Sequence, residues 1–174
     1  MIAETDRLIL RELTAQDALH FFELNSDPEV MLFTGDDPFQ SVAEAEHFLE
    51  NYSHYSEHGF GRWAVIRKSD NEFLGWCGLK MHQPTLSVKT NNYVDIGFRF
   101  FRKYWGQGYA TEAARKSLEI GFTRFGLKEI IGRTAKENIG SIKVLEKIGL
   151  SYFKNEECEG IEDALYYRIA KSLR

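Results

Sequence analysis

The most constraining feature of this sequence is a strand pattern that leads through a glycine-rich turn directly into a long helical pattern. Apolar residues alternate along positions 93–101, which places one set of them on one strand face: Val94, Ile96, Phe98 and Phe100. Positions 109–125 then carry apolar residues at helical spacing, and 129–134 predicts a short strand. A strand, a crossover helix and a second strand form a βαβ unit, so we expect the two strands to be parallel.

The rest of the chain surrounds this unit with further strands and helices. Alternating patterns predict strands at 7–13, 60–68, 72–82, 151–155 and 163–170, and the second and third of these form a hairpin. Thr14 and Ser41 are expected helix N-caps, segment 26–33 breaks the first helix, and Gly149 ends a helix that begins near 138. We therefore expect one α/β (α+β) domain over residues 1–174, with a mixed central sheet.

Composition limits the partners of this domain. The chain has 174 residues, 43% of them hydrophobic, and a formal net charge of −4, which argues against nucleic acid as the main partner. No apolar run approaches membrane-spanning length and the N-terminus lacks a secretory pattern, so we expect a cytoplasmic protein that does not bind membranes. The acids of 155–163 form either a solvated loop or a rim that attracts a cationic amine or basic peptide.

Cysteines and histidines show no metal-binding or disulfide pattern. The two cysteines form no CxxC motif, and the five histidines form no HExxH motif, so we expect no metal. Cys77 lies in an apolar strand and is interpreted as a core residue rather than an acetyl-carrying nucleophile. Cys158 falls in a polar segment that we expect to be a loop.

The two glycines of the turn indicate an anion site. Gly106 and Gly108 let the backbone approach a ligand closely, and the first N–H groups of the next helix have no partner within it. The helix N-terminus carries partial positive charge, to which Arg102 and Lys103 add, so a phosphate or pyrophosphate is the expected occupant. A P-loop motif is absent, and Thr111 stands where a dinucleotide fingerprint needs its third small residue. The alternative is a tight turn without a ligand.

Four segments, in order, resemble the GNAT N-acetyltransferases. WGQGYATEA (105–113) looks like that family's acyl-coenzyme A pyrophosphate loop, and ENIGSIKVLEKIGL (137–150) resembles its next helix, N-x-x-S-x-x-x-x-E-K-x-G. TDRLILREL (5–13) and VDIGFRF (94–100) look like the RimJ/RimL-type subfamily, whose members acetylate ribosomal-protein N-termini and other amines. The resemblance implies a largely antiparallel mixed sheet with one splayed parallel strand pair, helices on both faces, and acetyl-CoA as cosubstrate.

The resemblance also implies site residues by position. Backbone groups of Phe98, Arg99 and Phe100 would bind the pantetheine arm. Asn138 would hold the same arm between the splayed strands, and Ser141 would lie near the thioester sulfur. The pyrophosphate would lie against the turn, which is made by Trp105, Gly106, Gln107, Gly108, Tyr109, Ala110 and Thr111. One departure is Leu145, where many members, including polyamine acetyltransferases, have a tyrosine that acts as general acid; this disfavours a polyamine acceptor.

Acetylation of an amine by a thioester needs a neutral amine and a protonated leaving thiol. We nominate Asp95 as the general base, acting through water, because it lies on the strand face opposite Val94 and Ile96. The alternative for Asp95 is a solvated or salt-bridged acid. Ser141 is the candidate donor to the leaving sulfur, and its alternative role is local bonding to the backbone. Glu112 is interpreted as favourable charge at a helix start.

These observations predict an acetyl-CoA-dependent N-acetyltransferase in which a primary amine attacks the thioester directly. The acceptor is a peptide or protein N-terminus or a small amine, and the sequence does not decide between them. Members of the family are often dimers, so a homodimer is compatible with the resemblance. The alternatives are a non-catalytic acyl-CoA-binding sensor or regulatory module, and a nucleotide-binding protein.

Overall fold

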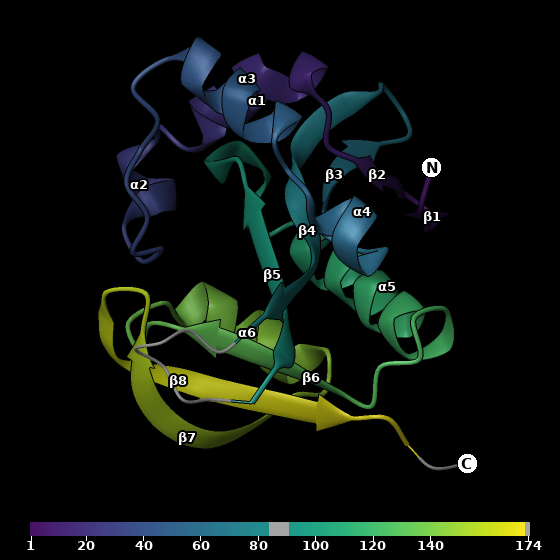
Figure 1. Ribbon diagram of the computed structural model, residues 1–174, viewed down its shortest axis with the longest axis vertical. Helices are drawn as coiled ribbons and strands as arrows, with labels where there is room; N and C mark the ends of the chain where they lie inside the picture. The colour runs from purple at the N-terminus through teal and green to yellow at the C-terminus, as the bar shows by residue number, and fades with distance from the viewer. Residues whose placement is uncertain (84–90, 173–174) are drawn as a thin grey trace.

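An eight-stranded sheet runs through the computed structural model, which describes residues 1–83 and 91–172 (Figure 1). The strand order is β1-β2-β3-β4-β5-β6-β8-β7, and every neighbouring pair is antiparallel except β5 and β6. The strands are Ala3–Glu4 (β1), Leu8–Glu12 (β2), Arg62–Arg67 (β3), Glu72–His82 (β4), Tyr93–Phe100 (β5), Glu129–Thr134 (β6), Ser151–Cys158 (β7) and Ile161–Ala170 (β8). The expected mixed, largely antiparallel sheet is confirmed.

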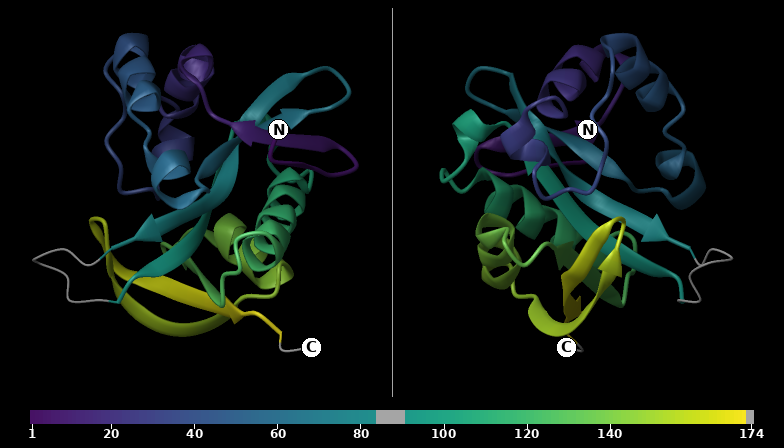
Figure 2. Two further views of the ribbon diagram at one scale, coloured as in Figure 1. Left: turned by 45° about the vertical axis from the view of Figure 1, so that its right-hand side comes forward. Right: turned by 90° about the vertical axis from the view of Figure 1, so that its left-hand side faces the viewer.

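Helices cover both faces of this sheet, as Figure 2 shows. They are Ala18–Leu24 (α1), Pro28–Met31 (α2), Val42–Glu50 (α3), His54–His58 (α4), Tyr109–Thr123 (α5) and Ile139–Lys147 (α6), with 3-10 turns at Ala15–Asp17 and Arg102–Tyr104. The longest helix, α5, packs through Ala113, Ala114 and Leu118 on the face that carries Val94 and Ile96. Helices α1, α2 and α3 bury a second apolar cluster on the opposite face. Among the described residues, no helix is both long and apolar enough to cross a membrane.

The βαβ unit is present as predicted, and its two strands separate soon after they pair. Strand β5 pairs with β6 in parallel at Asp95 with Ile131 and at Ile96 with Gly132. Strand β5 continues to Phe100, and in the described part of the chain no further β5–β6 pair is formed. Backbone groups of β5 beyond Ile96 therefore face an opening rather than a neighbouring strand. Gly132 is required beside this opening, because a side chain there would collide with Leu145 of α6.

One local prediction was incomplete and two were wrong. Segment 26–33 is not only a break: Pro28 starts a one-turn helix, because Asp27 accepts a hydrogen bond from the Glu29 N–H at 3.0 Å. The acids of 155–163 do not form an open loop but the end of β7, a tight turn and the start of β8. Cys158 accordingly lies in strand β7 and is 8% exposed. The expected cap at Ser41 is confirmed, since its Oγ accepts from the Glu44 N–H at 3.1 Å.

Candidate active site

A cavity of about 1540 Å³ lies where β5 and β6 separate. One end is lined by the glycine turn before α5, the middle by β5 and the start of α6, and the other end by the α2–α3 loop and the β7–β8 hairpin. The cavity therefore joins the predicted phosphate site to the predicted thioester site within one space. Most of the residues singled out in the sequence line it: Asp95, Phe98, Arg99, Phe100, Trp105, Gly106, Gly108, Tyr109, Ala110, Thr111, Asn138 and Ser141.

The glycine turn has the backbone conformation that an anion site needs. Gly106 and Gly108 have φ values of +74° and +81°, in the left-handed region that favours glycine. No atom lies within 4 Å of a Cβ built on Gly106, so the surface above the turn is open. Gly108 is the N-cap of α5, whose first N–H groups point out of the helix end. Gln107, the remaining turn residue, is exposed, and its side chain donates to the Lys103 carbonyl at 2.8 Å.

An arginine from the other end of the chain supports this turn, and the sequence analysis missed it. Arg7 donates from Nη1 to the carbonyl oxygen of Gln107 at 3.1 Å and from Nε to Glu112 at 2.6 Å. Its guanidinium also lies over the Tyr109 ring, 4.4 Å from the centroid. Glu112 accepts from the Thr5 hydroxyl as well, so its carboxylate ties α5 to the β1–β2 turn. Burial alone would raise the pKa of Glu112, but Thr5 and Arg7 lower it. Glu112 therefore does more than complement the helix dipole.

The start of α6 places Asn138 and Ser141 beside the opening between the strands. Asn138 is the N-cap, and its Oδ1 accepts from the backbone N–H of Ser141 at 3.1 Å. Within residues 1–83 and 91–172, the Ser141 hydroxyl itself forms no hydrogen bond. The expected alternative, a serine bonded locally through its hydroxyl, is thus not what the structure contains. Leu145, which stands at the family tyrosine position, is 1% exposed and packs in the core.

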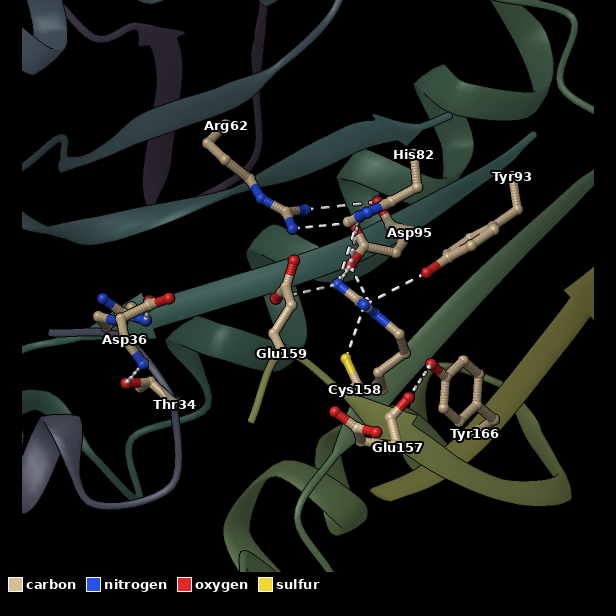
Figure 3. A network of polar contacts seen from close by, with 12 residues as sticks. Thr34, Asp36, Arg62, His82, Tyr93, Asp95, Glu157, Cys158, Glu159 and Tyr166 are labelled. Atoms are coloured by element: carbon tan, nitrogen blue, oxygen red, sulfur yellow. Dashed lines mark hydrogen bonds and ion pairs between the residues drawn. The ribbon is translucent and has the colours of Figure 1, made fainter. Parts of the chain in front are cut away.

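Asp95 lies at the centre of a buried ion cluster (Figure 3). Its side chain is 4% exposed, and its two oxygens pair with Arg62 Nη2 at 2.8 Å and with Arg133 Nη2 at 2.9 Å. His82 Nε2 lies 3.3 Å from the same carboxylate. Burial would raise the pKa of Asp95, but Arg62, His82 and Arg133 together hold it far below its ordinary value. A carboxylate with so low a pKa accepts protons poorly, so the structure favours the salt-bridged alternative over the general base.

Strand geometry explains why this cluster forms here. Asp95 and Lys80 are cross-strand partners, and Gly78 and Gly97 form the next pair on the same face of the sheet, two residues along. A Cβ on Gly97 would lie 2.7 Å from the Arg62 guanidinium carbon, so glycine lets Arg62 lie flat across β5. Arg62 can then reach Asp95 from β3, two strands away. Period-two alternation places Asp95 on its strand face, but it cannot reveal a side chain that crosses an intervening strand.

The cysteines differ in their surroundings. Cys77 is fully buried beside Ser117, and burial raises the pKa of its thiol to about 12, so it is a core residue and not a thiolate nucleophile. Cys158 lies in the cavity wall, where its sulfur accepts from Arg133 Nη1 at 2.7 Å. Across the part of the chain that the structure describes, no group of three or more His, Cys, Asp or Glu side chains could hold a metal ion.

Comparisons with known proteins agree with this geometry. Residues 7–151 match the family model described as an acetyltransferase (GNAT) domain. The chain is 33% identical over 145 residues to an uncharacterized N-acetyltransferase p20 from Bacillus licheniformis, covering 83% of this chain and 79% of that relative. It is 34% identical over 157 residues to FsC-acetyl coenzyme A-N(2)-transacetylase from Aspergillus fumigatus, covering 85% of this chain and 64% of that protein. The crystal structure of a GNAT-family acetyltransferase from Bacillus anthracis superposes with a TM-score of 0.75 at 30% identity, covering 96% of both chains.

Proposed function

This chain belongs to the GNAT acetyltransferase family, and we propose that it transfers the acetyl group of acetyl-CoA to a primary amine by direct attack on the thioester. Its relatives make it an N-acetyltransferase enzyme rather than a non-catalytic sensor. The resemblance of its opening segment and of β5 supports a RimJ/RimL-type subfamily. The observation that carries the proposal is a single cavity that joins the glycine turn at the start of α5 to the opening between β5 and β6.

The residues present fit coenzyme A. The turn at Gly106 and Gly108 offers open backbone N–H groups at a helix N-terminus, which suit a pyrophosphate. The free edge of β5, from Phe98 to Phe100, offers backbone donors and acceptors in an extended row, which suit the amide groups of a pantetheine arm. Asn138 and Ser141 lie across the opening from this edge. When bound, acetyl-CoA supplies an activated thioester.

The residues of this chain hold the thioester in place and donate hydrogen bonds to it. We assign Ser141 as hydrogen-bond donor to the leaving sulfur, because it lines the cavity and its hydroxyl is not bonded to any described residue. A backbone N–H of β5 near Phe98 is assigned to the developing oxyanion. Asp95 is assigned a positioning role, since its two arginine partners leave it a weak base. Deprotonation then depends on the acceptor: an α-amino group with a pKa of about 7.7–8.0 needs far less help than a lysine of about 10.4.

Thermal stability with saturating ligand tests the proposal. Acetyl-CoA at about a hundred times its dissociation constant should add ~2.7 kcal/mol and raise the Tm by roughly 5–11 °C, while ATP and NAD should leave it unchanged. Thioester cleavage that requires a primary amine should accompany this shift. No shift with acetyl-CoA, or a shift with NAD instead, would contradict the assignment of the glycine turn.

A further inference from the structure

A contact between two distant segments closes part of the cavity from outside. The loop 32–41, between α2 and α3, meets the tip of the β7–β8 hairpin (Figures 1 and 2). Gly35 has φ +71°, and a Cβ there would collide with the carbonyl oxygen of Glu159 and lie 3.4 Å from Ile161 Cγ1. We call this contact between Gly35 and residues 159–161 the bridge. The loop can approach the hairpin this closely only because residue 35 is a glycine.

The bridge forms a roof over the end of the cavity away from the glycine turn. Thr34 and Asp36 line that end on one side, and Glu159 and Ile161 line it on the other. In the view of Figure 3, Glu159 lies between Asp36 and the Asp95 cluster. The sheet forms the floor, so this end of the cavity is bounded above and below. A ligand there must fit beneath the bridge.

The floor beneath the bridge is flat and largely neutral in charge. Two guanidinium groups lie over the Trp76 ring, with Arg62 Cζ 5.4 Å and Arg99 Cζ 5.2 Å from its centroid. Arg62 is compensated by Asp95 at 2.8 Å, and Arg99 by Asp36 at 2.7 Å. Because these charges are already paired, the floor offers an aromatic and guanidinium surface rather than a free charge for an anionic group.

The wall of the cavity formed by α3 and the segments on either side of it is aromatic. Phe39 lies 5.7 Å from Phe48, and Phe48 lies 6.0 Å from Tyr52, between ring centroids, and all three line the cavity. The exposed carboxylates lie at the bridge itself: Asp36 and Glu159 are 52% and 51% exposed. Asp36 is paired with Arg99 and Glu159 with Arg133, so this end of the cavity offers a ligand apolar and aromatic surface rather than a free charge.

We propose that the acceptor is a small primary amine with an apolar or aromatic body, bound beneath the bridge with its amine toward the opening between β5 and β6. This inference rests on the acetyl transfer proposed above and selects between the two acceptor classes that the sequence left open. A folded protein cannot present its N-terminus across a roofed cavity unless the loop and the hairpin separate. A small amine needs no such opening.

Binding of bisubstrate conjugates tests this inference, because a conjugate reports the space beneath the bridge whatever the natural acceptor is. One probe joins the CoA sulfur through –CH2–CO– to phenethylamine, and a second joins it in the same way to the N-terminal amine of a folded protein whose ordered structure begins at its first residues. Isothermal titration should show the small conjugate binding at least as tightly as CoA, and the protein conjugate at least tenfold more weakly than the small one. Equal or tighter binding of the protein conjugate would overturn the inference. Failure of CoA itself to bind would instead refute the proposed function.

Two glycine variants separate the bridge from general effects. Gly35→Ala introduces a Cβ against the Glu159 carbonyl and should push the loop away from the hairpin. The ratio of the Kd for the protein conjugate to the Kd for the small conjugate should then fall at least fivefold, while the Kd for CoA stays unchanged. Gly126→Ala is the matched control, because Gly126 also has positive φ (+65°) and no atom lies within 4 Å of its Cβ position, but it belongs neither to the bridge nor to the cavity lining. A preference that Gly35→Ala leaves unchanged, or that both variants lower equally, would show that the bridge does not select the acceptor.

Discussion

Arg7 offers the sharpest test of how the glycine turn is built. Its guanidinium donates to the Gln107 carbonyl, pairs with Glu112 and covers the Tyr109 ring, so one side chain contacts both the glycine turn and the first turn of α5. Accepting a hydrogen bond at the Gln107 carbonyl fixes the peptide plane between Gln107 and Gly108. The N–H groups that follow are thereby held in place for an anion. Replacing Arg7 with methionine keeps much of the aliphatic stem and removes the donors.

The expected magnitude follows from the exposure of the groups. The Arg7 and Glu112 side chains are 45% and 21% exposed, so the ion pair itself contributes about 0.2–1 kcal/mol. The charge-assisted hydrogen bond to the Gln107 carbonyl adds about 1.5 kcal/mol or more. Only the share of this interaction energy that orders the glycine turn affects the free energy of ligand binding. We therefore expect Arg7→Met to weaken CoA binding by about 1–2 kcal/mol, which is roughly five- to thirtyfold in Kd.

The assay compares ligands with and without the pyrophosphate. Arg7→Met should raise the Kd for CoA and the KM for acetyl-CoA, while the KM for acetyl-pantetheine, which has no pyrophosphate, should stay near the wild-type value. Arg11→Met is the matched control, because Arg11 also pairs with a carboxylate, Asp17 at 2.7 Å, but neither residue lines the cavity. Equal weakening of CoA and acetyl-pantetheine, or the same loss in Arg11→Met, would refute the reasoning.

Two further variants test the opening between the strands. Ser141→Ala should lower kcat about tenfold to a thousandfold with little change in the Kd for CoA, and an unchanged kcat would remove the donor role. Asp95→Asn should destabilise the protein by about 3–5 kcal/mol at neutral pH, because Arg62 and Arg133 lose their buried counter-charge. The folded-state pKa of Asp95 is depressed, so its contribution is present above the unfolded pKa of about 3.9 and is lost as pH falls further. Urea titrations should therefore show a shallower acid-side loss of stability in Asp95→Asn than in the wild type, and parallel curves would contradict this.

Local patterns predicted the part of the site that is built from consecutive residues. The βαβ unit, the glycine turn and the N-cap of α6 each lie within one short stretch, so strand alternation, positive-φ glycines and helix-cap chemistry identify them directly. The cavity joins these stretches because β5 and β6 are parallel, so the helices that follow them both begin at the same edge of the sheet. The pairing of β8 rather than β7 with β6 does not follow from these local patterns.

The parts that were missed depend on long-range contacts. Arg7 meets Glu112 only because β1 and β2 form the sheet edge beside α5, and Gly35 meets Glu159 only because the α2–α3 loop reaches over the sheet. No local pattern marks either pair, since exposed arginines, acids and loop glycines are common in any chain. The environment of Asp95 was missed for the same reason. Its strand face was predicted, but its arginine partners come from two other strands.

The position of the Asp95 cluster points to a structural task at the fork between β5 and β6. Asp95 belongs to the first of the two β5–β6 pairs, opposite Ile131, while Arg133 lies two residues further along β6, beyond the last pair. The Asp95–Arg133 ion pair therefore joins the strands at the point where their backbone hydrogen bonds end. Beyond this ion pair, β5 continues toward Phe100 without pairing to β6 in the described part of the chain. A buried ion pair adds little net stability compared with apolar residues, but it is sensitive to geometry, because either partner left alone is costly. Such an ion pair suits a position where two paired strands must separate at a defined residue. It explains why a buried carboxylate lies here without assigning Asp95 a role in proton transfer.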